Sequence, residues 1–192
     1  EEEVRAAACE LPAAPTIINL EPKNLEQVLE SIADVARTLD VPFDRVLAGL
    51  RGRIDNVVAR GSRLNRRPRV ALLEWIDPPF ACGHWNPELV RLAGGIEGLG
   101  VEGEPSRMIE WQHVIEWNPE VIVIACCGFT VERTMEEISL LDSVPGWNDL
   151  AAVQAGHVHV VDGAAYFSRP GPRLVDSLEI LVDCIENVGG RT

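Results

Sequence analysis

Long apolar segments are missing from the sequence. No apolar run approaches the roughly 20 residues that a membrane-spanning helix needs, so we expect a chain that does not span a membrane. The chain opens with Glu1-Glu2-Glu3, the reverse of the basic start of a signal peptide, and we identify no signal peptide in it. Positive charge is scarce as well, because the formal net charge is -13. A surface of that sign repels phosphate backbones, which argues against nucleic acid as a partner.

Signatures of catalysis are missing too. The sequence has no Gly-x-Ser-x-Gly elbow, no phosphate-binding loop and no His-Glu-x-x-His. His157 and His159 would share one face of a strand, but no carboxylate or cysteine stands at ligand spacing beside them. We therefore expect no catalytic residue, no metal site and no resident cofactor. The sequence indicates a protein that is not an enzyme.

The cysteines have no regular spacing. An odd number of five without a repeated interval argues against a disulfide framework. The adjacent pair Cys126-Cys127 ends an apolar strand and lacks the two-residue gap of a zinc or redox motif. Free cysteine is among the most buried residue types, so small buried side chains at a strand end are the favoured interpretation of this pair.

What the sequence does contain is an ordinary globular composition and, after Pro68, a regular alternation of patterns. Hydrophobic residues make up 46% and charged residues 24% of the 192 positions. The pattern predicts an α/β fold in which residues 69–192 form a three-layer lobe with a mostly parallel sheet. The expected strands are 69–73, 121–125 and 158–161, and the expected helices are 87–92, 111–117, 131–141 and 174–187.

The first third of the chain has a different pattern. A helical pattern runs from Pro42 to Gly61 without an internal proline, and the basic connector 63–68 follows it. About 18 residues span roughly 27 Å, so we expect 42–68 to be a long linking helix and connector between two lobes. An expected strand at 16–20 and helix at 24–39 cannot bury a core alone. We therefore expect residues 1–41 to be the remnant of a first α/β lobe, with exposed apolar surface.

Aromatic residues make up only 5% of the chain, yet they gather in three segments that follow expected strands, 75–85, 127–130 and 163–173. The carboxyl ends of parallel strands meet at one edge of a sheet, where α/β proteins bind ligands. Aromatics there favour a flat, apolar or conjugated ligand held by stacking. The alternative is that the tryptophans form local core. The candidate ligand-binding residues are Trp75, Phe80, His84, Trp85, Phe129, Tyr166, Phe167 and Arg169.

Two of these candidates are polar. His84 lies within the first aromatic segment and is a candidate contact for the ligand, or an axial ligand for a metal that the ligand carries. Arg169, with Arg173, could meet a carboxylate or amide rim of the ligand. For Arg173 the alternative is a solvated or capping side chain.

Several of these motifs, in this order, resemble a known family. Asp77-Pro78-Pro79-Phe80 with Gly83, the helix end Leu92-Ala93-Gly94-Gly95, and the run from Tyr166 to Arg173 are similar to the second lobe of cobalamin-type periplasmic substrate-binding proteins. This is the helical-backbone metal-receptor family, which serves ABC importers of vitamin B12, haem and iron siderophores. Leu20-Glu21-Pro22 resembles the end of the family's first lobe.

The resemblance implies a periplasmic or cell-envelope protein that binds a corrinoid between two lobes and delivers it to an ABC importer permease. In the family, surface glutamates dock onto the permease, and Glu136 and Glu137 are the candidates here. One alternative is a haem or ferric-siderophore binder of the same family. Another is a metal-cluster or chelatase-like enzyme lobe. The aromatic loops carry few charges, which favours a corrinoid over an acidic siderophore.

Overall fold

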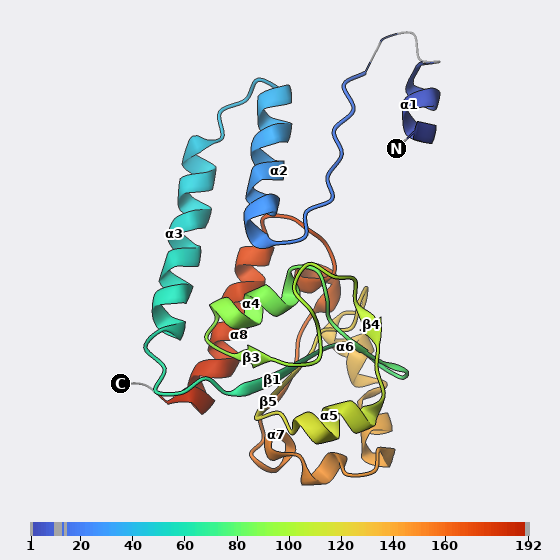
Figure 1. Ribbon diagram of the computed structural model, residues 1–192, viewed down its shortest axis with the longest axis vertical. Coiled ribbons are helices and arrows are strands. Elements are labelled where there is room, and N and C mark those ends of the chain that lie inside the picture. The colour runs from blue at the N-terminus through green and yellow to red at the C-terminus, as the bar shows by residue number, and fades with distance from the viewer. Residues whose placement is uncertain (1, 10–12, 14, 191–192) are drawn as a thin grey trace.

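Six strands form one mixed sheet in the described part of the chain after Pro68. Figure 1 shows where this sheet lies among the helices. The computed structural model describes residues 2–9, 13 and 15–190. The sheet has the order β4-β2-β1-β5-β6, and β3 also pairs with β1. Neighbours β1, β3, β5 and β6 pair in parallel, whereas β2 is antiparallel to both β1 and β4. The strands are β1 (Arg69–Ile76), β2 (Pro79–Ala81), β3 (Ile96–Glu97), β4 (Arg107–Met108), β5 (Val121–Ile124) and β6 (Val158–Val160).

Helices cover both faces of this sheet, so the predicted α/β fold with three layers is confirmed. On one face α4 (Asn86–Leu92) and α8 (Leu174–Gly189) share a core with alternate residues of β1 and β5. On the other face α5 (Trp111–Trp117), α7 (Ala151–Gln154) and the 3-10 turns Ile138–Ser143 and Trp147–Asp149 share a second core. All four residues of β5 are buried β-branched side chains, which suit a strand covered on both faces.

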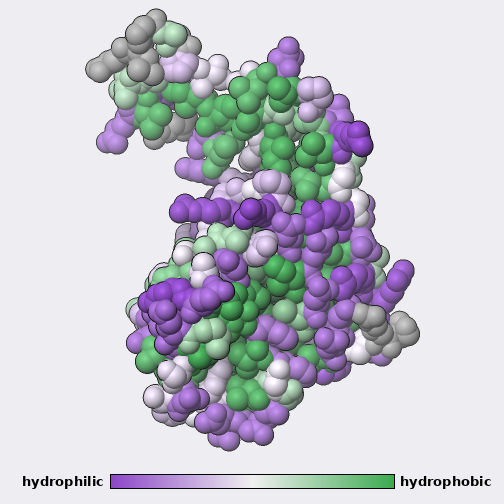
Figure 2. Space-filling model, turned by 180° about the vertical axis from the view of Figure 1, so that it is seen from behind, coloured by the Kyte–Doolittle hydropathy of each residue, from purple (hydrophilic) through white to green (hydrophobic). Residues whose placement is uncertain are grey.

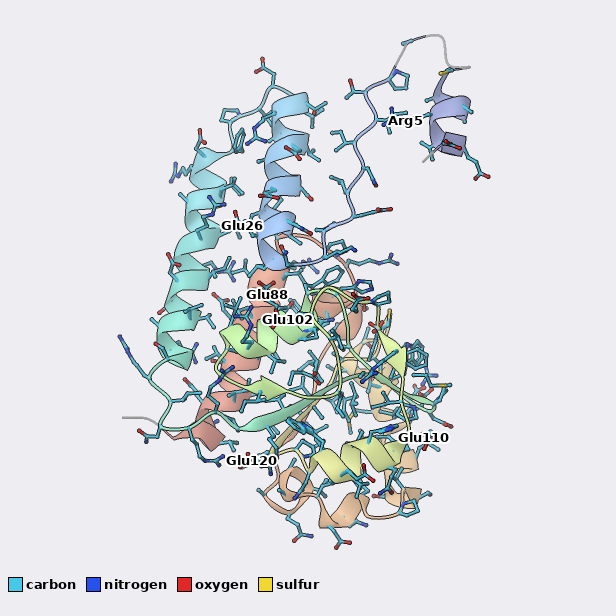
Figure 3. The ribbon with its side chains drawn as sticks, viewed as in Figure 1. Arg5, Glu26, Glu88, Glu102, Glu110 and Glu120 are labelled. Atoms are coloured by element: carbon cyan, nitrogen blue, oxygen red, sulfur yellow. The ribbon has the colours of Figure 1, made fainter. Side chains whose placement is uncertain are left out.

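Two helices rise from the lobe side by side (Figure 1). They are α2 (Leu25–Thr38), which Asn24 caps by accepting the Gln27 N–H, and α3 (Asp44–Gly61). The predicted helix at 42–60 is confirmed as a single uninterrupted element of 18 residues. A small core that includes Leu29, Leu50 and Val175 joins these helices to α8. The backbone N–H of Leu25 also donates to the Glu88 carboxylate at 2.8 Å, which fixes the start of α2 over α4 (Figure 3).

The chain before α2 differs from the expectation. The described residues 15–20 are extended but pair with no strand of the described part, so the predicted strand at 16–20 is wrong. A strand requires a hydrogen-bonded neighbour, and the local sequence alone does not supply one. The helix α1 (Glu2–Cys9) precedes this segment and has no buried residue. The expected boundaries between first-lobe remnant, linker and second lobe stay predictions.

Two further elements differ in extent. The expected loop after Leu73 is a hairpin, because β1 continues to Ile76 and turns directly into β2. The expected helix at 131–141 ends early: α6 spans Val131–Met135, and a 3-10 turn follows at Ile138–Ser143. In the described part of the chain, no helix is long and apolar enough to cross a membrane.

Ion pairs connect α3 to α8, and their contribution to stability can be tested by mutation. Arg53 binds both Asp176 and Glu179. We expect Arg53→Ala to lower the free energy of unfolding by only about 1 kcal/mol, because all three side chains are a third or more exposed and solvent screens such pairs. Urea unfolding at low and high salt tests this, since screening should shrink the loss at high salt. Arg45→Ala, at an exposed position on the same helix, is the control, and an equal loss in both variants would contradict the role of the pairs.

Candidate functional site

Three loops meet at the carboxyl ends of β1 and β5. The Cys127 N–H donates to the Glu74 carbonyl at 2.9 Å, which joins the loop after β5 to the end of β1. The Ala164 N–H donates to the Phe129 carbonyl at 3.0 Å, which joins the loop after β6 to the loop after β5. The three aromatic segments therefore lie at one edge of the sheet, where ligands of α/β proteins bind.

Two aromatic rings form a platform at this edge. The rings of Trp75 and Phe129 meet edge to face with centroids 4.8 Å apart, and both residues are half-buried. The Arg133 guanidinium lies over the Phe129 ring, 4.3 Å from its centroid. Arg133 also binds Glu137 and lies 3.4 Å from Glu136, so its charge is neutralised locally. These contacts fix the two rings relative to each other.

The loop after β6 packs against the platform through a glycine. A Cβ at Gly163 would lie 2.1 Å from the Cys126 carbonyl oxygen, so only glycine allows this approach. The Asp162 carboxylate accepts the Ala165 N–H at 2.8 Å and starts the π-helical turn Gly163–Phe167. Tyr166 is half-buried on this turn, and Arg173 lies 5.9 Å from the centre of its ring. Arg169 is exposed beyond the turn.

Two of the predicted binding residues lie beneath this surface. Trp85 is 6% exposed and Phe167 is 2% exposed, and both belong to the core between the sheet and α8. The indole Nε1–H of Trp85 donates to the Phe167 carbonyl at 3.3 Å. Their proposed contact with ligand stays a prediction, and the structure gives them a packing role under the site.

His84 is held at the edge of the site by a loop that sequence reasoning did not single out. It adopts a left-handed conformation with φ of 53°, and its ring lies 5.5 Å from that of Trp85. Its N–H donates to the Glu104 carbonyl at 2.6 Å, and its carbonyl accepts the Gly103 N–H at 2.9 Å. Ser106 Oγ accepts the neighbouring Gly83 N–H at 3.0 Å. The loop 98–106 thus positions His84, which is half-buried.

The other candidates divide between the hairpin and α6. Phe80 on β2 is half-buried and pairs with both Trp75 and Met108 in the sheet register. Glu136 is exposed at the end of α6, whereas Glu137 is half-buried and engaged by Arg133. In the described residues, no group of three or more His, Cys, Asp and Glu side chains could hold a metal ion.

Glu74 is the site residue that sequence reasoning missed. It ends the apolar run of β1 at the edge where the aromatics gather, and its Oε2 is buried without a hydrogen-bond partner. The detectable signal was a single acidic residue between the apolar residues Leu73 and Trp75.

An apolar depression lies over α2. Figure 2 shows apolar side chains gathered over the upper part of the molecule, and several large ones in residues 16–41 are exposed: Leu20, Leu39 and Val41 by 46%, 65% and 48%. The predicted exposed apolar surface of this segment is therefore confirmed. A groove of about 360 Å³ lies here and also reaches the loop after the π-helical turn. Its lining residues are Leu20, Pro22, Val28, Ser31, Ile32, Val35, Ala36, Leu39, Val41, Pro170, Gly171 and Pro172.

Comparison with known proteins identifies the fold. No protein-family model matches the sequence, and no curated protein matches it. An ABC transporter substrate-binding protein from Listeria monocytogenes EGD-e superposes with a TM-score of 0.75 at 16% identity, covering 88% of this chain and 67% of that one. The periplasmic vitamin B12 binding protein BtuF of Vibrio cholerae gives 0.72 at 19% identity, covering 95% and 68%. IsdE of S. aureus, complexed with heme, gives 0.73 at 14% identity, covering 86% and 66%.

The chain therefore has the fold of periplasmic substrate-binding proteins of ABC transporters, as the sequence resemblance implied. It spans about two thirds of the length of these three structures. At such identities the likeness shows the fold and leaves the ligand open.

Proposed function

We propose that the chain is part of the substrate-binding component of an ABC importer and binds a metal chelate, with a corrinoid as the leading candidate. The observation that carries this proposal is the platform of Trp75 and Phe129 at the sheet edge, next to the turn that holds Tyr166. Half-buried rings on a rigid edge suit a large, flat, conjugated ligand. The fold shared with a vitamin B12 binding protein supports the same interpretation.

The charges around the platform favour a ligand that is not strongly anionic. Arg133 is engaged by Glu136 and Glu137, and Arg173 donates to the Ala165 carbonyl at 3.4 Å. Arg169 and Arg173 are exposed at this edge, and neither has an ion pair among the described residues. A corrinoid, whose periphery consists largely of neutral amides, needs no cluster of free cations.

Haem is the second candidate, and His84 favours it. In the described part of the chain, neither ring nitrogen of His84 has a hydrogen-bond or ion-pair partner, and the ring lies 5.5 Å from that of Trp85. Histidine is a common ligand of haem iron. The heme-complexed structure with the same fold supports keeping this alternative.

We further propose that the ligand is held between this lobe and a companion lobe, and that Glu136 with Glu137 meets the permease. The exposed groove over α2 supports the first point, because an apolar surface of this kind is typical of an interface. The exposure of Glu136 at the rim of the site supports the second. The protein would then act in the cell envelope.

The proposal predicts that Trp75→Ala weakens binding of cyanocobalamin by roughly 5- to 150-fold, or about 1–3 kcal/mol, as for a hot-spot aromatic. Titration calorimetry with the purified chain measures this. Trp111→Ala is the matched control, because Trp111 is also half-buried and stacks edge to face, with Trp147 at 5.6 Å, but lies on α5. Trp111→Ala should lower the free energy of unfolding by a similar amount and leave the affinity for cyanocobalamin unchanged.

The same titration separates the candidate ligands. Binding of haemin with a shift of its Soret band, and none of cyanocobalamin, would replace the corrinoid with haem. If neither chelate binds and Trp75→Ala changes only the stability, the platform is structural and the proposed function is wrong.

A further inference from the structure

Glu74 occupies a break in the strand pairing directly beside the platform. Leu73 pairs with Ala81 and Trp75 pairs with Phe80, so Glu74 is the additional residue of a β-bulge. Bulges change the direction of side chains and are enriched next to functional sites. The Glu74 carbonyl holds the Cys127 N–H, so this residue is fixed where the loops after β1 and β5 meet.

One oxygen of the Glu74 carboxylate, Oε2, has no hydrogen-bond partner in the part of the chain that the structure describes. Its Oε2 is buried and receives no hydrogen bond, although the residue as a whole is only half-buried. Burial raises the pKa of the Cys82 thiol, and the negative charge of Glu74 is the next largest cause of this rise. The Glu74 carboxylate therefore lies near Cys82. An acceptor enclosed without a donor destabilises the folded protein, and a charged acceptor does so more strongly. Such a group in a native protein requires an explanation.

The cations near the site do not supply the missing donor. Arg133 is occupied by Glu136, Glu137 and the Phe129 ring. Arg173 donates to the Ala165 carbonyl and lies against Tyr166. A ligand that brings N–H donors would satisfy the carboxylate, whereas a ligand carboxylate placed there would face a like charge in a partly desolvated position.

We propose that Glu74 selects among metal chelates by the chemistry of their periphery: it accepts a hydrogen bond from a neutral carboxamide and disfavours a carboxylate at the same place. This inference rests on the proposed function and narrows it, because corrinoids carry carboxamides and haem carries carboxylates. The charge-assisted bond gives affinity for the first group, and repulsion between like charges gives discrimination against the second.

The test compares ligands that differ by one group. Cyanocobalamin and its monocarboxylic acids, in each of which one carboxamide is hydrolysed, are titrated against the chain and against Glu74→Gln. We expect the variant to bind cyanocobalamin about 5- to 10-fold more weakly, because glutamine keeps an acceptor but loses the charge that strengthens the bond. We expect at least one monocarboxylic acid to bind the unaltered chain at least about tenfold more weakly than cyanocobalamin, and Glu74→Gln to reduce that difference.

Controls keep the result interpretable. Glu116→Gln removes an exposed carboxylate on α5 that accepts a hydrogen bond from Gln112 at 2.9 Å, and it should change none of the affinities. Thermal melting shows whether Glu74→Gln is folded. Equal affinities of the unaltered chain and Glu74→Gln for every cobalamin would overturn the role of Glu74 and leave the proposed function standing. Binding of no chelate by the unaltered chain would overturn both.

Discussion

Trp85→Ala is expected to lower the free energy of unfolding by about 3–5 kcal/mol, the usual range when a large aromatic is removed from a core. The side chain is 6% exposed and packs in the core that β1, α4 and α8 share. Its removal would leave a cavity and also an unpaired Phe167 carbonyl, which now accepts the indole N–H at 3.3 Å. Urea unfolding followed by circular dichroism measures the loss.

Trp85→Phe separates the two contributions. Phenylalanine keeps most of the packing but cannot donate to the Phe167 carbonyl, so we expect a smaller loss than for alanine. The sequence-based interpretation of Trp85 as a ligand contact makes a different prediction. A Trp85→Ala protein with unchanged stability and a large loss of chelate affinity would support that interpretation and contradict the packing role.

The elements that the sequence predicted well are those that local pattern determines. The apolar run of β5, the helical spacing of α8 and the uninterrupted pattern of α3 each depend on neighbouring residues, and all three occur close to the expected positions. The meeting of three aromatic segments at one edge also followed from the pattern, because parallel strands place their carboxyl ends together.

The structure differs from the sequence-based predictions where strand formation depends on pairing with residues distant in the sequence. Residues 16–20 include Thr16, Ile17 and Ile18, which favour strands, but no neighbour pairs with them in the described chain. Beyond Leu73 the backbone pairs with β2 and β1 continues to Ile76, although Pro78 and Pro79 predicted a loop. Pairing partners lie elsewhere in the chain, so pattern within a segment cannot reveal them.

The meeting of the three aromatic segments was predictable, whereas the details of the candidate site were not. Composition identifies aromatics in loops but does not distinguish a half-buried ring from one that packs in the core, as Trp75 and Trp85 illustrate. The unpartnered state of Glu74 depends on a bulge, and the position of His84 depends on hydrogen bonds from the loop 98–106. Both features are properties of the assembled fold.

A buried carboxylate at the start of that same loop should control how stability varies with pH. Glu97 ends β3, and its Oε2 accepts the N–H groups of Leu99 and Gly100 at 2.9 and 2.6 Å. Its Oε1 is buried without a partner. Burial raises the pKa of Glu97 to about 7, even though the backbone hydrogen bonds and the charge of Arg107 act in the opposite direction.

The direction of the effect follows from proton binding. In the unfolded chain Glu97 releases its proton near its ordinary pKa of 4.5, whereas the folded protein retains the proton until about pH 7. The folded state therefore binds more protons within this window, and stability must fall as the pH rises through it. At about 1.4 kcal/mol for each pH unit, the loss between pH 4.5 and pH 7 is on the order of 3 kcal/mol. Above pH 7 the penalty stays constant.

Glu97→Gln should remove this penalty, because glutamine keeps an acceptor for the two N–H groups and carries no charge. We expect the variant to be about 2–3 kcal/mol more stable than the unaltered chain at pH 8 and close to it at pH 5. Urea unfolding of both proteins from pH 5 to pH 8 measures the difference. The pKa of His159 is lowered by burial, which gives stability the opposite slope near its ordinary value of 6.5, so only the difference between the proteins isolates Glu97. Glu116→Gln, at an exposed position, should leave the pH dependence unchanged. A constant difference between Glu97→Gln and the unaltered chain across this range would show that Glu97 does not take up a proton in the folded state.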